Sequence, residues 1–118
     1  KQISEKDAIV YITTDHGSIK VEEPSQMVGD KNVNNNLRYK LGRNMSYKES
    51  DVIEFKTPED ARLPKNSFNS KFILAKENKF FAYKNNFSHY AKYYKDTFQH
   101  GGVSMEEVIV PLIKLKIK

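Results

Sequence analysis

The chain has 118 residues, no cysteine, and a formal net charge of +5 from 20 basic and 15 acidic side chains. The absence of cysteine excludes disulfides and thiolate metal sites. No apolar run of about 18 residues is present, so no membrane-spanning helix is predicted and we expect a cytoplasmic protein without a membrane partner. The chain begins with Lys1 rather than Met. We therefore expect an excised fragment that forms a single partial domain over residues 1–118.

The first half of the chain predicts short strands. Residues 8–14 are apolar and β-branched, which predicts a strand covered on both faces, as in parallel sheets. Residues 18–22 alternate polar and apolar side chains and predict a half-buried strand that stops at Pro24. Residues 37–41 alternate again and predict a strand that ends at Gly42.

The middle of the chain gives mixed signals. Residues 52–55 fit either a short strand or one helical turn. Thr57-Pro58 followed by two acids predicts the start of a short helix, which Pro64 would end. The apolar runs 72–75 and 80–83 flank a polar tetrapeptide and predict a β-hairpin.

The last third predicts two helices and a strand. Tyrosines at helical spacing predict a helix over residues 88–98, with His89 on its surface. Ser104 and Glu107 have the spacing of a capping box and predict the start of a second helix. Residues 108–118 predict a terminal strand near a sheet edge, because their last half alternates cleanly. The fold class expected is α/β, with a mixed sheet, flanking helices and a β-hairpin.

Asp15, His16 and Gly17 follow the first predicted strand directly. In open α/β sheets, functional groups gather beyond the carboxyl ends of the strands. A carboxylate beside a neutral imidazole makes a plausible pair of metal ligands. The alternative is turn chemistry, in which Asp15 accepts backbone hydrogen bonds and Gly17 adopts a positive φ.

His100 opens a second motif, in which two glycines precede the predicted capping box. A histidine on such a loop suits contact with a metal or a phosphate; the alternative is a glycine turn without a ligand. Arg38 could bind a phosphate through paired hydrogen bonds, although a solvent-facing strand residue is the favoured interpretation. The positive charge can favour polyanions, but the scattered lysines fit a solvated surface better.

The two motifs together resemble a known family. Thr-Asp-His-Gly after an apolar strand, followed later by His-Gly-Gly-x-Ser-x-Glu-Glu-x-x-Val-Pro, resembles the C-terminal part of the alkaline phosphatase superfamily. The tail motif is most similar to that of the PglZ domain, which occurs as an effector module of some response regulators and in phage-defence systems. The motifs bracket residues 13–111, so the resemblance covers most of the chain.

The resemblance implies a metal-dependent hydrolase. Superfamily members hold two metal ions, usually zinc, and hydrolyse phosphate or sulfate esters. By this resemblance Asp15 and His16 ligate one metal and His100 ligates the other, whereas the nucleophile and the remaining ligands lie upstream of this piece. Three donors divided between two metals cannot close a four-coordinate site. We therefore expect the fragment alone to be inactive, leave its metal binding open, and expect the strand at 8–14 to self-associate through an exposed edge.

The leading hypothesis is the C-terminal fragment of a zinc-dependent phosphodiesterase that acts on a nucleotide-like substrate. It carries no catalytic residue of its own. The upstream half of the same domain and a response-regulator receiver domain of a two-component system are the expected protein partners. One alternative is a non-catalytic signalling or protein-interaction module on the same fold. A weaker alternative is a basic nucleic-acid-binding domain that uses the interleaved lysines and aromatics of residues 79–95.

Overall fold

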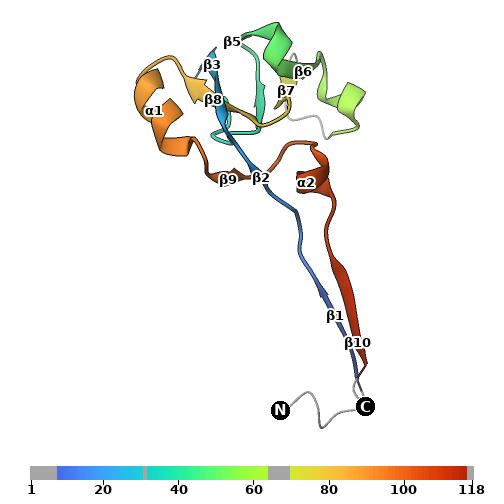
Figure 1. Cartoon of the computed structure of the whole chain (residues 1–118). Coiled ribbons are helices and arrows are strands. Elements are labelled where there is room, and N and C mark those ends of the chain that lie inside the picture. The colour runs from blue at the N-terminus through green and yellow to red at the C-terminus, as the bar shows by residue number, and fades with distance from the viewer. Residues whose placement is uncertain (1–7, 31, 64–69, 117–118) are drawn as a thin grey trace.

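A computed structural model describes residues 8–30, 32–63 and 70–116. It shows an α/β body from which a two-stranded ribbon extends, as Figure 1 shows. The body holds two three-stranded sheets, and parallel and antiparallel strand pairs occur side by side in one of them. The predicted α/β class is confirmed. None of the helices in these ranges is long and apolar enough to cross a membrane.

The ribbon consists of β1 (Ile9–Thr13) and β10 (Leu112–Lys116), which pair antiparallel along their whole lengths. Both predicted strands are therefore present, but the one predicted over residues 108–118 begins only at Leu112, since Val108 is helical, and residues 117–118 lie outside the described residues. The expectation that the first strand is covered on both faces is wrong, since Ile9 and Tyr11 are 52% and 57% exposed. Within the described residues β1 has one neighbouring strand, and the side chains of β10 are exposed as well.

A small sheet of two strands, each two residues long, joins the ribbon to the body. β2 (Ile19–Lys20) pairs antiparallel with β9 (Phe98–Gln99), and Val21 then enters the core with no exposed surface. The predicted stop at Pro24 is wrong, because β3 (Glu23–Gly29) contains this residue. Pro24 lies ahead of the point at which β5 joins β3, and a proline is tolerated where a strand has only one neighbour.

Two three-stranded sheets form the body. In the first, β3 lies between β5 (Met45–Tyr47) and β8 (Lys79–Tyr83). In the second, β7 (Lys71–Ala75) lies between β4 (Tyr39–Gly42) and β6 (Val52–Phe55).

The predicted hairpin is wrong, although both of its strands exist, because β7 and β8 belong to different sheets. β8 pairs parallel with β3. The second edge of β8 is also engaged, because the Phe81 N–H donates to the Leu37 carbonyl at 2.8 Å. The Arg38 carbonyl accepts from the Ala75 N–H of β7 at the same distance. Residues 37–38 thus contact both strands.

Other local predictions hold with shifted boundaries. β4 includes Gly42 rather than stopping before it, and residues 52–55 are a strand. A 3₁₀-helix, η1 (Glu49–Asp51), precedes β6. Thr57 is the N-cap of a second one, η2 (Pro58–Ala61), as predicted, and the structure adds a capping box between Thr57 and Asp60. Pro64, predicted to end that helix, lies outside the described residues.

The core has two parts. One lies between the sheets and contains Met27, Val33, Val52, Ile73, Ala75 and Phe81. The other is built on Val21, Phe80 and Ala82, and the helix α1 (Phe87–Tyr94) packs against it through Phe87, Tyr90 and Tyr94.

The helix predicted over 88–98 ends early, at Tyr94. Asp96 adopts a left-handed φ of 64°, and its N–H donates to the Val21 carbonyl at 2.7 Å, so the chain turns back toward the core. Phe98 lies in β9 instead. His89 is exposed on α1, as predicted. The second predicted helix is present as α2 (Met105–Val108), and Ser104 is its N-cap.

Candidate metal centre

The loops that carry the two histidine motifs meet where the ribbon joins the body. The first loop, residues 15–17, follows β1, and the second, residues 100–104, follows β9. The imidazole of His16 stacks on that of His100, with ring centroids 3.8 Å apart and planes 9° from parallel. The structure therefore brings together two of the three predicted ligands, which are far apart in the sequence.

The His16 ring is oriented by its own loop. Nδ1 lies 2.8 Å from the Gly17 carbonyl oxygen, so the tautomer with hydrogen on Nδ1 donates there and leaves the Nε2 lone pair free. Nε2 lies 3.7 Å from Oδ1 of Asp15. The Asp15 side chain is 90% exposed and that of His16 is 43% exposed. Both groups can therefore be reached from solvent.

Gly17 is needed for close approach rather than for an unusual backbone angle. Gly101 is the only glycine in the described ranges with a positive φ, so the turn that the alternative interpretation required at Gly17 is absent. A Cβ on Gly17 would collide with the Glu106 carbonyl. The Gly17 N–H donates to the Glu107 carbonyl at 2.9 Å, which joins the first loop to α2.

The second loop is held by residues that precede β4. Gly101 has a φ of 103°, a conformation that favours glycine. The Asn36 Nδ2 donates to the His100 carbonyl at 3.2 Å. The Asn36 Oδ1 accepts from the N–H groups of Arg38 and Tyr39, at 2.7 and 3.1 Å. Asn36 thereby connects the backbone of His100 to the start of β4.

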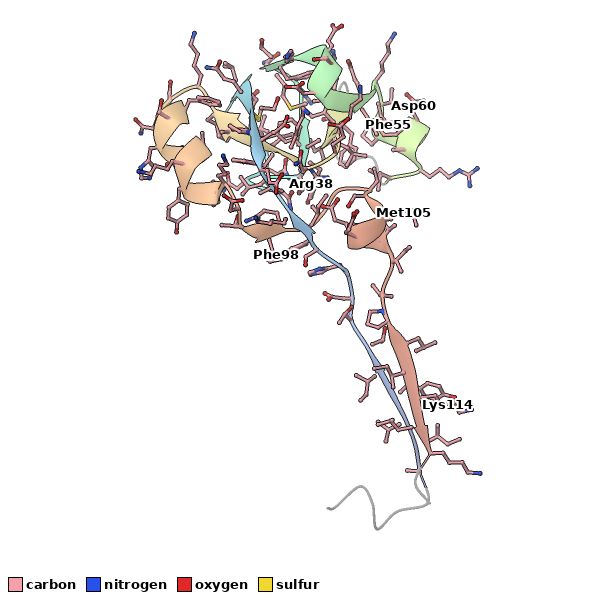
Figure 2. All side chains as sticks on the ribbon, viewed as in Figure 1. Arg38, Phe55, Asp60, Phe98, Met105 and Lys114 are labelled. Atoms are coloured by element: carbon pink, nitrogen blue, oxygen red, sulfur yellow. The ribbon has the colours of Figure 1, made fainter. Side chains whose placement is uncertain are left out.

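A buried ion pair lies beneath the second loop. The Arg38 Nε and Nη2 donate to Oε1 and Oε2 of Glu107, both at 3.0 Å, and each side chain is 1% exposed. The N–H groups of Gly102 and Ser104 donate to the same carboxylate at 2.9 and 3.2 Å. Figure 2 shows Arg38 inside the body, on the side from which the ribbon leaves.

Two opposing effects act on the Glu107 carboxyl. Burial raises its pKa, whereas the hydrogen bonds from Arg38, Gly102 and Ser104, with the Arg38 charge, lower it. The lowering effects prevail, and the pKa lies below its ordinary value. Glu107 is therefore ionised at neutral pH.

The favoured interpretation of Arg38 as a solvent-facing strand residue is wrong, because the side chain is 1% exposed. Its Nη1 also donates to the Lys79 carbonyl, so the guanidinium has protein partners on two sides. Contact between Arg38 and a phosphate stays a prediction. Sequence reasoning assigned Glu107 to a capping box and did not find its pairing with Arg38, since no local pattern connects residues so far apart. The role of Asn36 was missed for the same reason.

The structure does not favour the nucleic-acid alternative. Phe80 and Phe81 are buried in the core, at 0% and 1% exposure, and cannot stack on bases. Lys79 pairs with Glu23 and Glu77 at 3.0 and 3.2 Å. Tyr93 is exposed, but His89 already stacks on it.

No group of three or more His, Asp or Glu side chains in the described ranges is placed to hold one metal ion. Imidazole and carboxylate groups are donors that zinc accepts, and the ring centroids of His16 and His100 lie 3.8 Å apart. The donor types at this place therefore suit zinc, but the described residues do not complete a site by themselves.

Comparison with known proteins adds one finding. A family model described as the BREX system PglZ alkaline phosphatase-like domain matches residues 1–115. The matched range contains both histidine loops and the Arg38–Glu107 pair. A search of curated proteins finds no match to the sequence.

Proposed function

The chain belongs to the PglZ alkaline phosphatase-like domain family, and on this premise we propose that it is part of a zinc-dependent phosphodiesterase. Membership of this family indicates a phosphoesterase-type fold. The observation that supports the proposal is the stack of His16 on His100, because two loops distant in sequence bring side chains of a metal-ligand type to one exposed place. The substrate that we propose is an anionic, nucleotide-like phosphodiester, which the net charge of +5 can favour although the lysines are scattered along the chain.

In this proposal each histidine serves a different ion. Asp15 and His16 would hold one zinc ion, and His100 would hold the other. When bound, a zinc pair would polarise the phosphoryl group and stabilise its charge. The chain's own residues orient the donors, since the Gly17 carbonyl fixes Nδ1 of His16 and Asn36 fixes the backbone of His100. The nucleophile and the remaining ligands would come from an upstream half of the same domain.

The test uses the intact protein that contains this chain, purified without chelators. We expect about two zinc ions per chain and hydrolysis of bis(p-nitrophenyl) phosphate, with both reduced by His100→Ala or His16→Ala. His89→Ala is the matched control, because His89 is an exposed histidine on α1 and lies outside both loops. A protein that takes up no zinc and stays inactive when zinc is added would contradict the proposal.

A second candidate function is a non-catalytic protein-interaction module. The exposed apolar side chains of the ribbon favour it, since Leu112 is 71% exposed and Tyr11 57%. Among the described residues, β1 and β10 pair only with each other, and their outer edges would also allow self-association. Under either function we propose a cytoplasmic location. A link to a response-regulator receiver domain stays a prediction.

A further inference from the structure

One residue touches both histidine loops. The backbone carbonyl of Glu107 accepts the N–H of Gly17, next to His16, at 2.9 Å. Its carboxylate accepts the N–H groups of Gly102 and Ser104, just after His100, at 2.9 and 3.2 Å. The two loops are thus joined to opposite ends of the same residue.

The Glu107 carboxylate has its hydrogen-bonding capacity filled. Oε1 accepts from the Arg38 Nε and the Gly102 N–H, and Oε2 accepts from the Arg38 Nη2 and the Ser104 N–H. A carboxylate has about four acceptor positions and no donor. A glutamine amide would direct an NH₂ group at two of these donors. The site therefore requires a carboxylate and not merely a polar side chain of the same size.

The packing around Glu107 leaves no space on either side. A Cβ on Gly102 would lie 2.5 Å from Oε2 of Glu107 and 3.0 Å from Nη2 of Arg38. A Cβ on Gly17 would collide with the neighbouring Glu106 carbonyl. Because the glycine of each motif is in close contact with this short helix, a shift of Glu107 must move both loops.

We propose that Glu107 is a positioning residue that holds the two loops at the spacing at which His16 stacks on His100. Arg38, the residue before β4, fixes Glu107 in turn by pairing with both carboxylate oxygens. An effect of Glu107 on metal binding rests on the proposed function, whereas its effect on the stacking of His16 and His100 does not.

The experiment compares Glu107→Gln with Asp60→Asn in the intact protein, after metal is stripped with a chelator. Asp60 is the matched control because its carboxylate closes the other capping box, with Thr57 on η2. Selective ¹³C labelling of histidine reports the stack through the upfield ring-current shifts of the His16 and His100 ring protons. Titration with zinc chloride alone reports the affinity.

We expect Glu107→Gln to abolish the upfield shifts and to weaken zinc binding by about 10- to 100-fold, as loss of a group that orients a metal ligand does. Asp60→Asn should change neither quantity. Unchanged ring shifts in a folded Glu107→Gln protein would overturn the inference, whatever its zinc affinity. Loss of the shifts, in a protein whose wild type binds no zinc, would refute the proposed function and leave the positioning role intact.

Gly102→Ala tests the same contact if Glu107→Gln does not fold. Gly102 does not have a positive φ, so alanine is compatible with its backbone, and the added Cβ acts on Oε2 of Glu107. The same loss of ring shifts and of zinc affinity is expected. A folded Gly102→Ala protein with wild-type values for both would overturn the inference.

Discussion

Lys40 is a buried cation, and its replacement by methionine should stabilise the fold. The side chain is 1% exposed, its Nζ donates to the Asn34 carbonyl at 2.9 Å, and it lies 4.7 Å from the centroid of the Tyr83 ring. No ion pair to Lys40 occurs among the described residues. Burial lowers the pKa of Lys40 from 10.5 to about 8.

The size of the effect follows from this difference in pKa. At about 1.36 kcal/mol per pH unit, a pKa of about 8 instead of 10.5 means that burial costs the charged form about 3 kcal/mol. Methionine keeps most of the apolar stem but loses the hydrogen bond to Asn34 and the contact with Tyr83, together worth about 1–2 kcal/mol. We therefore expect Lys40→Met to raise the free energy of unfolding by about 1–2 kcal/mol at pH 7.

The gain should depend on pH in a defined direction. Below pH 8 Lys40 is protonated in the folded and unfolded states, so the whole cost of burial is present. Between pH 8 and 10.5 the folded state has released a proton that the unfolded state keeps, so the wild type gains stability as pH rises. The advantage of Lys40→Met should therefore shrink over this window.

Urea unfolding of both proteins at pH 7 and pH 10 measures the effect, because the contributions of the other lysines cancel in the difference. Lys48→Met is the matched control, since the side chain of Lys48 is 73% exposed, and it should have little effect. A Lys40→Met protein that is less stable than wild type at pH 7, or whose advantage is the same at both pH values, would refute the reasoning.

Three further predictions concern the junction. Gly17→Ala should destabilise the fold by about 1–3 kcal/mol in thermal melts, because its Cβ collides with Glu106; a wild-type melt would contradict the packing described. Asn36→Ala should cost about 1–3 kcal/mol and Asn36→Asp less, because the aspartate keeps the acceptor used by two N–H groups; equal losses would exclude that acceptor as the cause. Acid titration should remove the contribution of Glu107 to the free energy of unfolding. Because the pKa of Glu107 is lowered in the folded state, this contribution is fully present above the ordinary pKa of 4.5 and is lost as the pH falls through the pKa of the folded state. Glu107→Gln should lack this acid-dependent loss, and an identical pH profile in both proteins would contradict the assignment.

The parts of the fold that the sequence predicts correctly depend on neighbouring residues. The N-cap role of Thr57 and the capping box of Ser104 were recognisable because each depends on groups within three residues of one another. The prediction of a hairpin was wrong because strand pairing is not local, and β8 pairs with a strand more than fifty residues earlier. The prediction that the first strand is buried was wrong for a related reason. An apolar run favours burial, but it does not reveal which segments are available to cover it.

In the candidate site, too, local features could be predicted from the sequence and long-range contacts could not. His16 and His100 could be identified because each stands in a compact motif with glycines beside it. Their stacking, and the pairing of Arg38 with Glu107, depend on how β4, α2 and the ribbon come together in space. An arginine on an alternating strand has the pattern of a surface residue, and only the charge of its distant partner offsets the cost of burying it.

The hydrogen bond between the Gly17 N–H and the Glu107 carbonyl also defines the path of the chain. The polypeptide enters the body at Gly17 and leaves it at Glu107, and the nitrogen of the first lies 2.9 Å from the carbonyl oxygen of the second. The segment between them is thus an insertion whose two ends touch, carried on the two strands of the ribbon (Figure 1). Segments with adjacent ends tolerate transfer between scaffolds and circular permutation. A segment of residues 15–108 contains both histidine loops, and both would move with it to a host that offers a pair of antiparallel strands.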